Sequence, residues 1–250
     1  MKIISIANQK GGVAKTTSAI NISYYLAELG YKTLLIDFDP QASASSGLGF
    51  RKVEKSIYEL LYGHSYKDVE VTTNNKNLYV IPSNQNLAAF EFEAMLVDRK
   101  ESKLKDVLTS IKEFDFVIVD CPPSLGLLTI NALVASEYIL IPVQTEFFAL
   151  EGLSLLLETA AKVKKRWNMK LEVMGIILTM CDKRNMHHRE VIADIKHHFG
   201  AKVFQQEVRR NIRLAEAASF GKSICEYDKK SIGAQIYKEI VFELLKKVGY

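Results

Sequence analysis

Hydrophobic and polar positions along the chain alternate between two patterns, short apolar runs typical of strands and amphipathic stretches typical of helices. The predicted strands are Lys2–Ala7, Lys32–Phe38, Leu78–Pro82, Phe114–Val119, Tyr138–Pro142, Val173–Met180 and Lys202–Phe204. The predicted helices are Thr16–Leu29, Val53–Leu61, Leu87–Val97, Ser102–Ile111, Gly126–Ser136, Ala149–Arg166, His187–Phe199, Asn211–Phe220 and Ser231–Val248, with a loop over Ala42–Phe50. This alternation predicts an α/β fold: a mainly parallel twisted sheet with helices on both faces.

Nothing in the composition divides the chain, and we expect one domain over residues 1–250. Hydrophobic residues make up 48% and charged residues 25%, as in ordinary globular proteins. The apolar runs are too short to cross a bilayer, and no signal peptide precedes the first strand, so we expect a cytoplasmic protein. The three cysteines have no C-x-x-C spacing, which favours reduced core cysteines over a metal site.

The net charge of +4 is unevenly distributed. Residues 162–250 contain 19 Lys/Arg and 10 Asp/Glu, a charge of +9, which leaves −5 for residues 1–161. A basic C-terminal third beside an acidic remainder indicates contact with a polyanion. A basic surface without a partner would give the same count, so charge alone leaves both open.

A candidate phosphate-binding loop joins the first strand to the first helix at residues 8–17 (NQKGGVAKTT). Gly11 and Gly12 let backbone N–H groups close on phosphate oxygens, and the helix N-terminus adds its positive dipole end. An ordinary glycine turn is the alternative, but two lysines and two threonines behind a buried strand favour the phosphate site.

The loop departs from the G-x-x-x-x-G-K-[ST] pattern of such sites, because Gln9 and Ala14 occupy the two glycine places. What remains is K-G-G-x-x-K-T-T, in which Lys10 precedes the usual lysine, Lys15, by five residues.

Three aspartates follow two of the predicted strands. Asp37 and Asp39 come at the end of the second strand, and Asp120 follows Phe114–Val119. Because the carboxyl ends of parallel strands share one edge, these carboxylates should lie beside the loop, where Mg²⁺ bound with a nucleotide would balance their charge. Thr16 can offer its hydroxyl to Mg²⁺, Asp120 can accept from metal-bound water, and Asp37 can support the same water shell. Asp39, before a proline, could instead be a turn former.

Several stretches together resemble the deviant Walker A ATPases of the ParA/MinD family, and specifically partition ATPases of the ParA/Soj type. They are Asn8–Thr17, Asp37–Gln41, Ser46–Gly49, Asp120–Ala132, Pro142–Leu153 and Asn211–Glu216, and the match runs over essentially the whole chain. The resemblance implies a P-loop NTPase fold and slow hydrolysis of ATP with Mg²⁺.

The resemblance also implies roles for single residues. Lys15 would bind the β- and γ-phosphates and Thr16 the Mg²⁺, while Lys10 would reach the phosphates of a partner in an ATP-dependent homodimer. Asp39 would position the attacking water, and Asp120 would hold the metal's water shell. The implied ATP-binding set is Lys10, Gly11, Gly12, Val13, Ala14, Lys15, Thr16, Thr17 and Asn211.

Two positions depart from the family pattern. Ala14 stands where many members have glycine, which could narrow the loop. Arg209 stands where the family usually has proline, two residues before Asn211, which matches a base-contacting position. The two departures therefore fall in the phosphate loop and in the segment predicted to contact adenine.

The resemblance implies non-specific DNA binding by the ATP-bound dimer through Arg184 and Arg213, with Lys183, Arg189 and Arg210 near them in sequence. Lysine and arginine contacts to phosphate carry no base information, and no base-reading motif is present. A ParB-type partner would stimulate hydrolysis and return the dimer to monomers, and the ATP-bound form would associate with the nucleoid.

Two alternatives share the fold. The MinD branch binds membranes through a C-terminal amphipathic helix, and Ile232, Ile236, Ile240, Leu244 and Val248 form such a stripe here. A helix packed on the core has the same pattern, and we expect that packing and no membrane partner. The second alternative is a metabolic ATP-dependent ligase such as dethiobiotin synthetase, which needs a small-molecule pocket opposite the γ-phosphate.

Overall fold

The computed structural model describes residues 1–146, 148–182 and 184–250. Within these residues seven strands form one sheet in the order β3-β4-β2-β5-β1-β6-β7, parallel throughout except where β3 pairs with β4. The strands are β1 (Lys2–Ile6), β2 (Thr33–Asp37), β3 (Val71–Thr72), β4 (Leu78–Ile81), β5 (Phe116–Asp120), β6 (Tyr138–Gln144) and β7 (Glu172–Thr179). The predicted fold class is confirmed.

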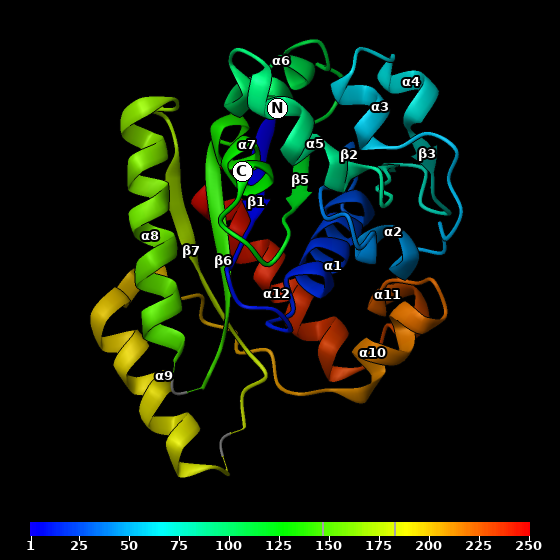
Figure 1. The fold of residues 1–250 in the computed structure, drawn as a ribbon. Helices are drawn as coiled ribbons and strands as arrows, with labels where there is room; N and C mark the ends of the chain where they lie inside the picture. The colour runs from blue at the N-terminus through cyan, green and yellow to red at the C-terminus, as the bar shows by residue number, and fades with distance from the viewer. Residues whose placement is uncertain (147, 183) are drawn as a thin grey trace.

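Helices cover both faces of this sheet (Figure 1). The α-helices are α1 (Lys15–Glu28), α2 (Ser43–Gly47), α3 (Ile57–Leu61), α4 (Tyr66–Val69), α5 (Leu87–Glu93), α6 (Lys103–Thr109), α7 (Leu127–Ala135), α8 (Ala149–Arg166), α9 (Met186–Phe199), α10 (Ile212–Ser219), α11 (Ile224–Tyr227) and α12 (Ile232–Lys247). Short 3-10 turns are η1 (Ala94–Leu96), η2 (Lys100–Ser102) and η3 (Gly200–Lys202).

The central strand β5 shows why its sequence has no polar face. Val117 and Val119 point into the apolar layer that contains α5 to α9, while Phe116 and Ile118 point into the layer of α1 and α12. All four side chains are fully buried, as expected for a strand with helices on both sides. The carboxyl end of β5 is therefore held rigidly at the sheet edge where the candidate site lies.

Some predicted elements differ from the structure. The predicted loop over Ala42–Phe50 contains the short helix α2, and the strand predicted at Lys202–Phe204 is wrong, because η3 and one bridge between Ile176 and Val203 take its place. The helix predicted from Val53 begins only at Ile57, where Ser56 and Glu59 form a capping box.

The C-terminal helix packs on the core. Tyr237, Ile240 and Leu244 are fully buried, and the Tyr237 hydroxyl lies 3.1 Å from the Ser18 hydroxyl of α1. Most of the apolar stripe of α12 therefore faces α1 and the sheet, although Ile232 at its start is exposed. Among the described residues, no helix is long and apolar enough to cross a membrane.

Candidate nucleotide-binding site

The loop between β1 and α1 contains two residues in the left-handed region. Gly12 has φ 75°, and Ala14 has φ 64° and ψ 32° immediately before α1 begins at Lys15. A residue with a Cβ atom pays about 1–2 kcal/mol for this conformation, and glycine pays almost none. The sequence suggested that alanine at position 14 would narrow the loop. In the structure the consequence of its methyl group is backbone strain instead.

Lys15 is buried and reaches back across the loop. Its Nζ donates to the backbone oxygen of Lys10 at 2.9 Å. Burial lowers the pKa of the Lys15 ammonium, and the charge of Asp120 is the strongest of the influences that oppose this. The ammonium is thus held inside the loop, close to the carboxylates that end the neighbouring strands.

Asp37 and Asp120 lie side by side, because they are register partners at the ends of β2 and β5, and both are fully buried. Two acids this close repel each other when both are ionised. Burial and then the charge of Asp37 raise the pKa of Asp120 well above its ordinary value, while the Thr16 hydroxyl and Lys15 act in the opposite direction.

Asp120 lacks the hydrogen bonds that its neighbour has. Neither of its carboxyl oxygens has a hydrogen bond of ordinary geometry to a described residue. Asp37 accepts from the backbone N–H and the hydroxyl of Ser45, both at 2.7 Å, and from the backbone N–H of Asp39 at 3.2 Å. A buried carboxylate without donors is costly, so Asp120 is the group in this site that most needs a cation or bound water.

Asp39 is also buried, 8% exposed, and lies near Asp37 and Asp120. Its Oδ1 accepts from the backbone N–H of Gln41 at 2.9 Å, which is the turn-forming contact that a residue before proline can make. The turn contact engages one carboxyl oxygen, and the position beside Asp37 and Asp120 keeps the predicted water-positioning role open to the other.

Lys10 points to a different partner from the one the resemblance implies. Its Nζ forms an ion pair with Glu146, which follows β6, and both side chains are about two-fifths exposed, 41% and 43%. The bond with Lys10 is the main cause that lowers the pKa of the Glu146 carboxyl. The sequence motif around Glu146 was part of the resemblance, but no role for this residue could be inferred from it.

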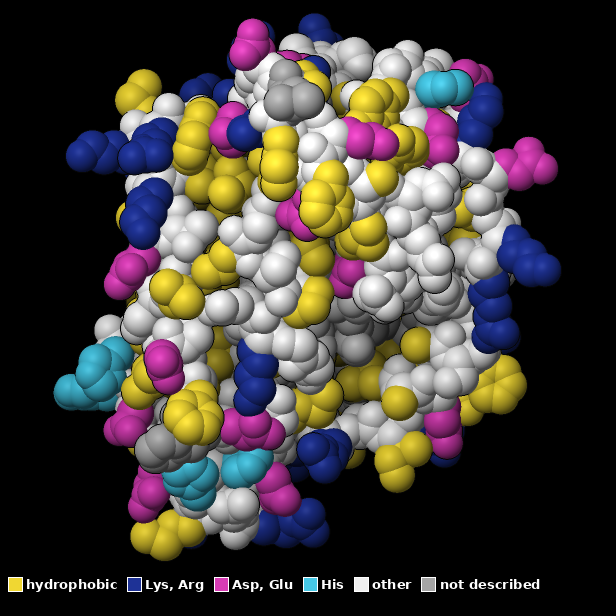
Figure 2. Space-filling view, viewed as in Figure 1, with side chains coloured by type: hydrophobic (Ala, Val, Ile, Leu, Met, Phe, Trp, Pro, Cys, Tyr) yellow, Lys and Arg dark blue, Asp and Glu magenta, His cyan; other side chains and the backbone are white. Residues whose placement is uncertain are grey.

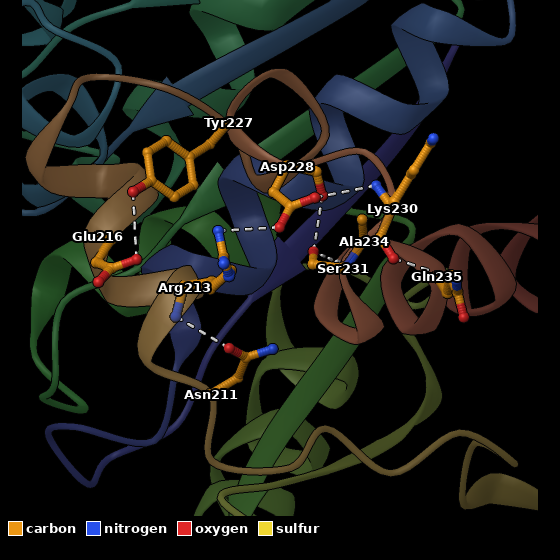
Figure 3. Close-up of polar contacts among 9 residues, drawn as sticks. All are labelled: Asn211, Arg213, Glu216, Tyr227, Asp228, Lys230, Ser231, Ala234 and Gln235. Atoms are coloured by element: carbon orange, nitrogen blue, oxygen red, sulfur yellow. Dashed lines mark hydrogen bonds and ion pairs between the residues drawn. The ribbon is translucent and has the colours of Figure 1, made fainter.

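A cleft of about 750 Å³ lies where the chain passes from β7 toward α12, and Asn211 forms part of its lining. It is lined by Val208, Arg209, Arg210, Asn211, Ile212, Arg213, Glu216, Tyr227, Ile232, Gly233 and Ile236. Asn211 caps α10, since its Oδ1 accepts from the backbone N–H of Arg213 at 2.9 Å (Figure 3). The volume is that of a small-ligand site.

The end of β7 connects this cleft to the loop. Thr179 Oγ1 donates to the backbone oxygen of Val13 at 3.1 Å, and an isolated bridge joins Cys181 to Arg209. The predicted base-contacting segment therefore lies alongside the strand that touches the phosphate loop.

The predicted DNA-contacting arginines are exposed and paired with acids. Arg184 makes two contacts with Asp182, at 3.1 Å and 3.2 Å, and Arg213 forms an ion pair with Asp228 at 3.1 Å (Figure 3). Arg189 and Arg210 are also exposed, whereas Lys183 lies outside the described residues. Figure 2 shows basic side chains interspersed with acidic ones on this part of the surface, rather than an unbroken basic patch.

Comparison with known proteins agrees with this geometry. A family model described as an AAA domain matches residues 1–173. The sporulation initiation inhibitor protein Soj of Bacillus subtilis is 46% identical over 97% of this chain and 98% of its own length. The chromosome partitioning protein ParA of Caulobacter vibrioides is 41% identical over 99% of this chain and 95% of its own.

One similar solved structure comes from Mycobacterium smegmatis and is named cobyrinic acid a,c-diamide synthase with bound ATP analogue and magnesium. It has a TM-score of 0.87 and 33% identity, and the alignment covers all of this chain and 96% of the other. Its name describes a different reaction from that of the partition proteins. Its ligands, an ATP analogue and magnesium, are of the kind that the sequence predicts for this chain.

A parallel sheet whose first strand leads into a lysine-containing phosphate loop, with two aspartates at the adjoining strand ends, defines a P-loop nucleotide-binding protein. Identity over nearly the whole length narrows the class further. The chain belongs to the ParA/Soj family of chromosome-partitioning ATPases.

Proposed function

We propose that this chain binds ATP with Mg²⁺ in the loop before α1 and hydrolyses it. The observation that carries the proposal is Asp120, a fully buried carboxylate without a hydrogen bond of ordinary geometry to a described residue, placed beside Thr16 and Lys15. A catalytic nucleotide site supplies what Asp120 lacks, a cation and its water shell.

The residues around Asp120 fit Mg²⁺. Among the described residues no three His, Cys, Asp or Glu side chains form a cluster that could ligate a metal directly, so Mg²⁺ would be held by Thr16, by phosphate oxygens and by water. Asp120 would accept from that water, with Asp37 behind it. Bound Mg²⁺ would supply positive charge to the phosphates, as in other P-loop ATPases.

The other catalytic roles fall to Lys15 and Asp39. Lys15, which now donates to a loop carbonyl, would exchange that acceptor for the β- and γ-phosphates. Asp39, near Asp37 and Asp120, would orient the attacking water. In-line phosphoryl transfer needs little more from the protein than positioning and charge. Asn211 would contact the base from the cleft beside β7, and Gly11, Gly12, Val13, Ala14 and Thr17 would complete the ATP-binding set.

Lys10 gives the reason for an ATP-dependent homodimer. Its side chain projects to Glu146 at the surface rather than into its own loop. In a dimer that faces two loops toward each other, Lys10 would leave Glu146 and reach the phosphates of the partner.

We further propose that the ATP-bound dimer binds DNA without sequence preference, through Arg184, Arg213, Lys183, Arg189 and Arg210 of each protomer. Dimerisation doubles the number of phosphate contacts, and affinity rises steeply with that number. A ParB-type partner would stimulate hydrolysis and return the protein to monomers, so that it alternates between the cytoplasm and the nucleoid.

DNA retention by the purified protein tests this function, measured with ATP, with ADP and across a salt series. We expect retention with ATP that falls with salt and is weakened in Arg213→Ala, while Arg99→Ala serves as the matched control. Arg99 is an exposed arginine paired with an acid, Asp106, far from this region in sequence. Equal retention in every nucleotide state, or none at low salt, would refute the partition proposal.

The ligase alternative has one supporting observation besides the Mycobacterium relative. A polar cleft of about 650 Å³, which includes Gln41, Ser83 and Asn86 in its lining, lies beside the Asp39 turn. A ligase would hydrolyse ATP only when its small-molecule substrate was supplied, whereas a partition ATPase would respond to DNA and its protein partner. The MinD-like alternative would require α12 to release its buried face before it could bind lipid.

A further inference from the structure

A buried serine outside the predicted site connects three segments of the fold. Ser45 lies in α2, in the stretch that the sequence predicted to be a loop, and is fully buried. Its hydroxyl contacts Asp37 at the end of β2 and the backbone of Ser83 after β4. We propose that Ser45 is a positioning residue for Mg²⁺ binding, which holds the Asp37 carboxylate in the orientation that the water shell of the metal requires.

The hydrogen bonds fix the direction of the Ser45 proton. The backbone N–H of Ser83 donates to Ser45 Oγ at 2.9 Å, so this oxygen already serves as an acceptor. Its own proton is then directed at Asp37 Oδ2, 2.7 Å away. The backbone N–H of Ser45 donates to the same oxygen at 2.7 Å. Two short bonds to one carboxyl oxygen set both the position and the plane of the Asp37 carboxylate.

The orientation of Asp37 matters because of its register partner. Asp37 and Asp120 are adjacent and fully buried, and of the two only Asp37 accepts hydrogen bonds of ordinary geometry from described residues. Two ionised acids would repel each other if the Asp37 carboxylate were able to turn. By occupying Oδ2, the Ser45 bonds leave Oδ1 of Asp37, which also accepts from Asp39 N–H, as its less engaged oxygen. The pair then offers a fixed set of acceptors to metal-bound water.

Ser45 could instead simply fasten α2 to the sheet. A structural tie would affect thermal stability but would not change the difference between nucleotide affinity with and without Mg²⁺. A positioning residue changes that difference and leaves metal-free nucleotide binding intact, because Lys15 and the loop are untouched.

The inference rests on the proposed function, and its test measures the affinity of a fluorescent ATP analogue, with Mg²⁺ and with EDTA. We expect the gain in affinity on adding Mg²⁺ to be about tenfold smaller in Ser45→Ala than in the wild type, the size expected for one hydrogen bond to a charged group. Ser45→Thr keeps the hydroxyl and should restore the gain. Ser43→Ala, an exposed serine of the same helix, is the control. If Ser45→Ala does not fold, Ser45→Cys, with its weaker donor, should show an intermediate gain beside Ser45→Thr.

A double-mutant cycle makes the assignment sharper. In an Asp37→Asn background, the change at Ser45 should have little further effect on the Mg²⁺-dependent gain, because the two residues act as a unit. Full additivity would overturn the inference, as would an unchanged gain in Ser45→Ala or a failure of Ser45→Thr to restore it. If the wild-type protein bound no analogue under either condition, the proposed function itself would be wrong.

Discussion

Replacing Ala14 with glycine should stabilise the protein, although glycine substitutions usually destabilise. Ala14 has φ 64° and ψ 32°, a conformation that costs a residue with a Cβ atom about 1–2 kcal/mol. Glycine relieves this strain but makes the unfolded chain more flexible, which costs about 0.4–1 kcal/mol. The net gain in the free energy of unfolding is about 0–1.6 kcal/mol, and in a chain of this size each kcal/mol raises Tm by roughly 2–4 °C.

The assay is thermal unfolding of the nucleotide-free protein, with two further alanines for comparison. Ala42→Gly should also stabilise, because Ala42 has φ 52°. Ala161→Gly should destabilise by about 1 kcal/mol, since Ala161 is an exposed residue within α8. If Ala14→Gly lowered Tm as much as Ala161→Gly does, the left-handed conformation of Ala14 would not be a source of backbone strain.

Three other predictions follow from the site. Asp228→Asn frees Arg213 from its ion pair, so DNA retention with ATP should rise up to about fivefold at low salt, the range for an exposed pair; no change would mean that Asp228 does not compete with DNA. Asp39→Ala should bind ATP and dimerise without turnover, whereas Lys15→Gln should lose nucleotide binding, and normal turnover in Asp39→Ala would contradict the water-positioning role. Burial raises the pKa of Asp37 from 3.8 to about 6, so between these values the folded chain keeps a proton that the unfolded chain loses, and the free energy of unfolding falls as pH rises. Thermal unfolding in EDTA should show this fall in the free energy of unfolding in the wild type. In Asp37→Asn the fall should be smaller by on the order of 2–3 kcal/mol.

The sequence was sufficient for the six parallel strands because each is a short apolar run, and two of these end in the aspartates of the site. It missed the two-residue edge strand β3 and wrongly predicted a strand at Lys202–Phe204. It was insufficient for α2, whose serines and glycine have poor helix propensity. That helix is stabilised by tertiary contacts, above all those of Ser45 with Asp37 and Ser83. Local sequence contains no record of such partners.

The same reason explains what could be predicted of the candidate site. Asp37, Asp39 and Asp120 follow strands that were recognisable, so their neighbourhood with the loop could be inferred before the structure. Glu146 and Asp228 could not be inferred as partners of Lys10 and Arg213, because those pairs depend on how distant segments meet. The left-handed conformation of Ala14 also had no sequence signal other than the missing glycine.

The contacts at the end of β7 have a consequence for how ATP binding and DNA binding affect each other. Thr179 is bonded to the phosphate loop, and the bridge from Cys181 to Arg209 begins two residues later, at the segment that continues to Arg213. If ATP in the loop alters DNA affinity through this strand end, the effect must be reciprocal. DNA would then strengthen ATP binding by the same factor, and so would act as an effector of the nucleotide site as well as a binding surface.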